Sequence, residues 1–200
     1  MKNSVRFKSG ISALLFAALL ILIDPLMMIP CLIAAGVHEC GHLLFAYYLR
    51  IPIRELKLDL LGAHLSLSSA VISYKAEFFL CAAGPLFSFL LAEGIGWVYP
   101  MLSLRLPSAV SAFLCAVEES SRFLGILNLI PVKGFDGARM LSALLSSLFS
   151  AHVADCAVRF FTGIFLILLW GISVYLLLLT ESGLILFVFS FAMFCKIRFL

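Results

Sequence analysis

Charged residues are scarce in this sequence. Lys, Arg, Asp and Glu make up 12% of its 200 residues, whereas hydrophobic residues make up 64%. An ordinary soluble domain is about one quarter charged and about half apolar, and a domain of this size has too little interior to bury such an excess. The composition therefore argues against a soluble domain and against disorder. It predicts an integral membrane protein with little mass outside the bilayer.

The sequence also lacks the patterns of several other protein classes. Lys and Arg outnumber Asp and Glu by 14 to 11, but they form no dense basic cluster, so no nucleic acid is expected as a partner. The six cysteines stand singly, with no CxxC pair, which argues against a metal knuckle and against a disulfide framework. The partner that the composition does imply is the lipid bilayer.

Long apolar runs dominate the chain and predict an all-α polytopic membrane protein with about six transmembrane helices, in one membrane-embedded domain over residues 1–200. Residues 51–73, between the second and third runs, alternate apolar and polar residues on both sides of Gly62. That period of two predicts a small β-hairpin. The six runs are Ile11–Ile23, Leu26–Leu49, Ala76–Tyr99, Ala109–Ile130, Phe160–Leu179 and Leu184–Cys195.

The basic residues predict how the chain lies in the membrane. Six spans would put both termini on one face, and most Lys and Arg residues would then lie on or near that face, with Arg105 on the other. Because Lys and Arg concentrate in cytoplasmic loops, the crowded face is expected to be cytoplasmic. We therefore expect a multi-pass protein of a bacterial-type cytoplasmic membrane with both termini in the cytoplasm.

The second apolar run contains the HExxH motif His38-Glu39-Cys40-Gly41-His42. Two histidines four residues apart share one face of a helix and can bind the same zinc ion, while Glu39 beside them can take a proton from water. The alternative is that these side chains merely pack in a helical core. Ionisable groups in a membrane span are costly, at roughly 2.5 to 3.5 kcal/mol each when charged. That cost favours a functional site.

A catalytic zinc site needs a third protein ligand, and Asp136 is the best candidate. It lies in the segment Asn128–Gly137, where Pro131 and two glycines interrupt an otherwise apolar stretch. Broken backbone at membrane depth is tolerated where it is buried in protein or lines a polar cavity, which is suitable for a metal ligand. The alternative for Asp136 is an Asp-Gly turn at the start of a helix.

Together these segments resemble the site-2 protease family, the intramembrane zinc metalloproteases. That family pairs HExxH in one transmembrane helix with NxxPxxxxDG in a later one, and both patterns are complete here, at His38–His42 and Asn128–Gly137. Gly84–Ser88 is similar to the GxxxN/S/G motif of the intervening span. The core motifs cover residues 31–140, with C-terminal helices in residues 157–200, and the chain looks most like the small sporulation-type branch.

The resemblance implies a function and the residues that carry it. One zinc ion per chain would be bound by His38, His42 and Asp136, with Glu39 as the general base and acid, while Asn128, Pro131, Gly84 and Ser88 would bind substrate or support the site. The reaction would be hydrolysis of a peptide bond of a membrane-associated protein within or near the bilayer, releasing a transcription factor. A membrane inhibitor protein is a further partner that the resemblance allows.

Two other interpretations use the same residues or neighbouring ones. A transporter or sensor for a divalent metal would need the ligands but not Glu39 as a base, and a transporter would also need further ionisable residues along a path. Glu118-Glu119-Ser120-Ser121-Arg122 is similar to the EExxxR motif of membrane-embedded CAAX-type proteases, but it is one residue short and no later histidine motif accompanies it. We interpret it as a charge cluster at the membrane interface.

Overall fold

The computed structural model describes residues 6–9, 25–51, 53–59, 62–67, 72–102 and 105–179, and residues 187–188, 190–191 and 193–194. Its elements in chain order are β1 (Arg6–Ser9), α2 (Pro25–Tyr48), β2 (Ile53–Asp59), β3 (Gly62–Leu67), α3 (Tyr74–Leu102), α4 (Ser108–Leu129), α5 (Asp136–Leu148) and α6 (Ala151–Leu179).

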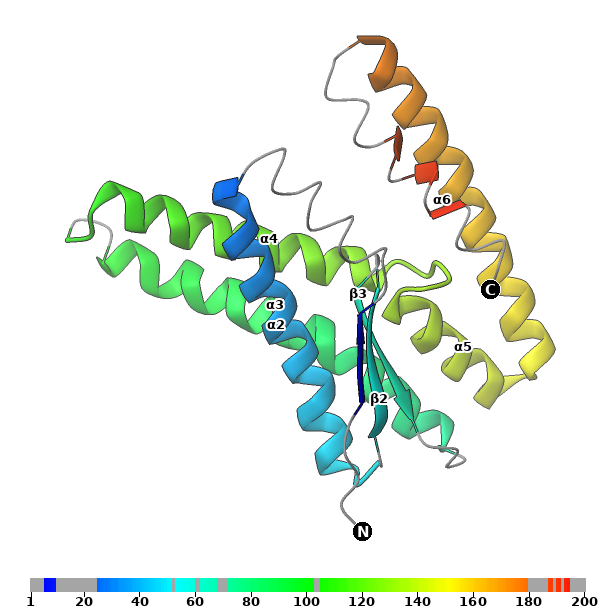
Figure 1. Ribbon diagram of the computed structural model, residues 1–200. Helices are drawn as coiled ribbons and strands as arrows, with labels where there is room; N and C mark the ends of the chain where they lie inside the picture. Colours follow the sequence, from blue (N-terminus) through cyan, green and yellow to red (C-terminus); the bar gives the residue numbers. More distant parts are fainter. Residues whose placement is uncertain are drawn as a thin grey trace.

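Helix α3 is the centre of the arrangement, since it packs against α2, α4 and α5 (Figure 1). Its buried face consists largely of small side chains, which allow neighbouring helices to approach closely. In Figure 1, α4 runs beside α3, and α2 crosses both helices. The buried residues of α3 are Leu80, Cys81, Ala83, Gly84, Pro85, Ser88 and Ala92.

Helix α6 packs against α5, and in Figure 1 it stands apart from α2 and α3. Only 11% of its most apolar window is buried within the protein. Side chains such as Ile167, Trp170 and Leu178 are exposed. Such a surface would be unfavourable in water and is suited to lipid, so α6 supports the assignment of this chain as a membrane protein.

The predicted fold class, all-α with about six transmembrane helices and no strands beyond a small β-hairpin, is wrong. In the described part of the chain three helices are long and apolar enough to cross a bilayer, namely Met27–Tyr48, Tyr74–Leu102 and Ala151–Leu179. Helix α4 is not among them because Glu118, Glu119 and Arg122 interrupt its apolar sequence. The predicted span Ala109–Ile130 had been counted despite those charges.

The strands also differ from the expectation. Strands β2 and β3 pair antiparallel, with Asp59 opposite Gly62, in the stretch where a hairpin was predicted. They belong to a three-stranded sheet of order β1-β2-β3, because Arg6–Ser9 pairs parallel with residues 55–58 of β2. The predicted hairpin included no such third strand. The predicted span Ile11–Ile23 lies outside the described residues, and so does most of Leu184–Cys195.

The break between α4 and α5 is fixed by residues that cannot continue a helix. Ile130 is extended (φ −64°, ψ 130°), as expected before Pro131, and Gly134 has a positive φ of 105°, which glycine adopts without strain. Val132 and Phe135 are buried against residues of α6. A Cβ added to Gly137 would lie 2.2 Å from the carbonyl oxygen of Leu129, so the start of α5 packs directly on the end of α4. Asp136, the first residue of α5, is therefore held at a defined position.

Candidate metal centre

Three side chains that are distant in the sequence meet at one point. The Nε2 atoms of His38 and His42 are 3.2 Å apart, and each lies 3.1 Å from Oδ2 of Asp136. Both histidines are buried, with 4% and 5% of their surface exposed. Helix α2 provides both histidines because residues four apart share a helix face, and α5 provides the carboxylate. The three form a group that could hold a metal ion.

The hydrogen bonds of the two Nδ1 atoms indicate which ring nitrogen of each histidine carries a lone pair. Nδ1 of His42 lies 2.8 Å from the carbonyl oxygen of Leu80, which can only accept, so Nδ1 carries the hydrogen. Nε2 of a neutral His42 is then an acceptor, and it faces a carboxylate oxygen, another acceptor. Nδ1 of His38 lies 2.9 Å from Oγ of Ser88, a group that can accept in the same way. The two Nε2 atoms and Oδ2 of Asp136 therefore face one another as acceptors, and a cation between them would make their contact favourable.

A divalent metal fits this donor set better than a proton does. One proton can bridge only one pair of the three atoms, whereas a metal ion binds all three together. Zinc with tetrahedral bonds of about 2.0 to 2.1 Å would hold its ligand atoms roughly 3.3 Å apart, close to the 3.1 to 3.2 Å separations here. Metal-binding histidines generally donate their other N–H to a carbonyl or another polar group, as His42 does to Leu80.

Helix α3 forms a wall against the two histidines. A Cβ added to Gly84 would lie 2.2 Å from Nε2 of His42 and 2.6 Å from Nε2 of His38, so any other residue would occupy the space of the donor atoms. Ser88, one turn further along, is fully buried and holds His38. Gly84 and Ser88 therefore both lie against the histidines of the site. The Leu80 carbonyl could not be predicted from sequence because every residue has one.

Glu39 follows His38 directly on α2, and its Oε2 atom is buried. The residue as a whole is partly exposed. Because it is the neighbour of His38 in the chain, it is a candidate for the proton transfer that a metal-dependent hydrolysis would need.

Two other predicted residues, Asn128 and Pro131, do not join the donor set. Nδ2 of Asn128 donates to the carbonyl oxygen of Leu124 one turn earlier in α4, at 3.0 Å, and Pro131 lies in the break before α5. The two remaining histidines of the chain also lie outside the donor set. His152 is exposed at the start of α6. His64 is in β3, opposite Lys57. The structure thus brings together His38, His42 and Asp136, with Gly84 and Ser88 against them.

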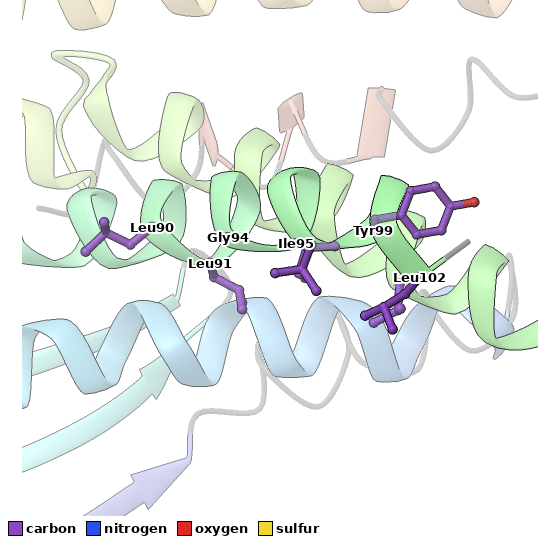
Figure 2. A pocket seen from close by; sticks show the side chains of 8 residues that line it. Leu90, Leu91, Gly94, Ile95, Tyr99 and Leu102 are labelled. Carbon is purple, nitrogen blue, oxygen red and sulfur yellow. The ribbon is translucent and has the colours of Figure 1, made fainter. Parts of the chain in front are cut away.

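A separate apolar cavity of about 290 Å³ lies along the later part of α3. Figure 2 shows Leu90, Leu91, Ile95 and Leu102 around it, with the hydroxyl group of Tyr99 directed away from these side chains. A large apolar pocket is often the first candidate for a ligand site, but polar groups are needed to orient a bound ligand and to react with it. This cavity is lined by apolar side chains and the Tyr99 ring and contains none of the donor atoms, so the chemistry belongs to the metal centre.

The role of Ser88 can be tested through metal affinity. Ser88→Ala removes the hydrogen bond to Nδ1 of His38, and loss of such a supporting partner typically lowers metal affinity about 10- to 100-fold. Competition with a chromogenic chelator would measure the affinity of the purified protein. Ser173→Ala, which removes a buried serine of α6, is the matched control and should leave the affinity unchanged. Wild-type affinity in Ser88→Ala would show that Ser88 does not support the site.

Comparison with known proteins places this geometry in a known fold. No protein-family model and no curated protein matches the sequence. The structure is similar to that of the site-2 protease from Methanocaldococcus jannaschii, with a TM-score of 0.71 and 20% sequence identity, and the match covers 96% of this chain and 89% of that one. At this identity the likeness is one of fold. The chain therefore has the fold of a site-2 protease.

Proposed function

We propose that this chain is an intramembrane zinc metalloprotease. The observation that carries the proposal is the convergence of His38, His42 and Asp136 on one point in a protein built of apolar helices, with Glu39 next to His38 in the sequence. The fold of a site-2 protease supports it. The imidazole and carboxylate ligands suit zinc, and three protein ligands leave the open position that a catalytic site needs.

Each residue of the site has its own role in the proposed hydrolysis. Zinc, when bound, supplies a Lewis acid that polarises the peptide carbonyl and acidifies water. His38, His42 and Asp136 hold it, and the hydrogen bonds to Ser88 and Leu80 orient the two imidazoles. Glu39 accepts a proton from the attacking water and donates it to the nitrogen of the leaving amine. Water is thereby divided between the new carboxyl and amino termini.

The substrate that we propose is a membrane-associated protein, cut within or next to the bilayer. Burial of the donor atoms among apolar helices supports this choice, because a soluble chain would have to enter the membrane to reach them. Release of a transcription factor, as in sporulation-type enzymes, is the outcome we propose for the cleavage, and an inhibitory membrane protein is the proposed regulator. Asn128 and Pro131 would contribute to substrate binding at the break before α5.

Glu39→Gln tests the proposed reaction. The amide has nearly the same shape as the carboxylate but cannot take the proton, so cleavage should fall by about 10²- to 10⁴-fold, while zinc content and folding stay unchanged. Membranes of the protein's own cells, incubated with each purified variant, would be analysed by mass spectrometry for new protein termini. Glu119→Gln, at an exposed position of α4, is the control and should cut like the wild type.

Undiminished cleavage in Glu39→Gln would contradict the mechanism. If wild-type protein binds zinc but generates no new termini, the chain is a metal-binding protein without protease activity.

We also propose that the end of the bundle where α2 stops and α3 begins faces the cytoplasm. Arg50 and Lys75 lie at this end, whereas Arg105, after α3, lies at the opposite one. This distribution agrees with the excess of basic residues in cytoplasmic loops. Pairing of β1 with β2 supports a cytoplasmic N-terminus, because β2 follows α2 at the same end. A cytoplasmic C-terminus stays a prediction.

Thiol labelling tests this orientation. In a background without the native cysteines, Arg105→Cys should react with a membrane-impermeant reagent added to intact cells. Lys75→Cys should react only after the membrane is permeabilised, because the bilayer shields the cytoplasmic face. The reverse pattern would overturn the orientation.

A further inference from the structure

An ion pair next to the metal centre has no part in the function described above. Arg139 of α5 and Glu77 of α3 are connected by a contact of 3.4 Å between Nη2 and Oε1. Both side chains are about one third exposed, at 35% and 34%. They are 62 residues apart in the sequence, so the contact joins two helices rather than two turns of one.

The ion pair lies one helical turn from the metal ligands on both helices. Arg139 is three residues after Asp136, and residues three apart share a helix face. Glu77 is likewise three residues before Leu80, whose carbonyl oxygen holds His42. The pair thus connects the turn that carries the carboxylate ligand with the turn that orients a histidine ligand. Among the described residues it is the one ion pair, apart from those of Asp136 itself, that joins α5 to another helix.

The segment before Asp136 is also held by α6. The backbone N–H of Lys133 donates to Oγ1 of Thr162 on α6, at 3.0 Å, and Val132 and Phe135 pack against residues of α6. A cavity of about 170 Å³ adjoins the ion pair, with Glu77, Lys133, Arg139 and Asp155 in its wall. Residues of α3, α5 and α6 line it, so side-chain packing is incomplete beside the ion pair.

From this arrangement we propose that Glu77 and Arg139 are positioning residues that set the rotation of α5, and so place Oδ2 of Asp136 against the two histidines. This inference rests on the proposed function as a metal-dependent protease. A partly exposed ion pair contributes little to folding stability. Metal affinity, in contrast, depends on donor atoms held within a fraction of an ångström. The pair should therefore affect metal binding much more than folding.

The experiment compares four full-length variants with the wild type in detergent: Arg139→Gln, Glu77→Gln, the charge exchange Glu77→Arg/Arg139→Glu, and Arg122→Gln. The last is the matched control. It removes an arginine of α4 that also pairs with a glutamate of α3, Glu93, but at a position nine residues beyond Gly84. Zinc affinity is measured by chelator competition, the visible absorption spectrum after loading with Co²⁺ reports ligand geometry, and thermal unfolding of the metal-free protein reports stability.

We expect Arg139→Gln and Glu77→Gln to bind zinc about 10-fold more weakly and to change the Co²⁺ spectrum, without lowering the unfolding temperature of the metal-free protein. The charge exchange should restore most of the affinity, and Arg122→Gln should match the wild type. Wild-type affinity and spectrum in Arg139→Gln would overturn the positioning role while leaving the proposed function intact. Loss of affinity in parallel with unfolding, without recovery in the exchange, would make the pair structural only. Failure of the wild type to bind zinc would overturn the proposed function itself.

Discussion

The site depends on the meeting of three candidate metal-ligand atoms inside an apolar protein. Two imidazole nitrogens and a carboxylate oxygen lie 3.1 to 3.2 Å from one another. In their neutral or anionic forms these atoms repel, and water is scarce among apolar helices, so a bound cation is what makes the arrangement favourable. The neighbouring residues of α3 and of the break before α5 keep these atoms in place.

Helix α3 contributes no ligand, yet it determines the shape of the site. Gly84 leaves room for both Nε2 atoms, and the Leu80 carbonyl and the Ser88 hydroxyl hold the far sides of the rings. On the other side, Pro131 and Gly134 stop the chain from continuing as a helix, so that Asp136 can start α5 at the depth of the histidines. The small residues of α3 and the helix break before α5 therefore both serve to bring the three atoms together.

Local patterns in the sequence predicted the grouping of His38, His42 and Asp136 better than the architecture. The spacing of His38 and His42 follows from the helical period, and Pro131 and the glycines indicate the break that carries Asp136. By contrast, β1 pairs with β2 through partners 49 positions apart in the sequence, and no local pattern encodes such pairing. The span count failed at α4, where Glu118, Glu119 and Arg122 lie within an apolar run. The contacts of Glu77 with Arg139 and of His42 with the Leu80 carbonyl arise from helix packing, which a single sequence does not reveal.

The central claim is that His38, His42 and Asp136 together bind one zinc ion, and the zinc content of the purified protein tests it most directly. Wild-type protein should hold about one equivalent per chain. Asp136→Ala should lose most of this zinc after dialysis against a weak chelator, because only two ligands remain. Asp155→Ala, which changes an exposed aspartate of α6, should retain it. Zinc-free wild-type protein, or an Asp136→Ala variant with full zinc content, would contradict the account.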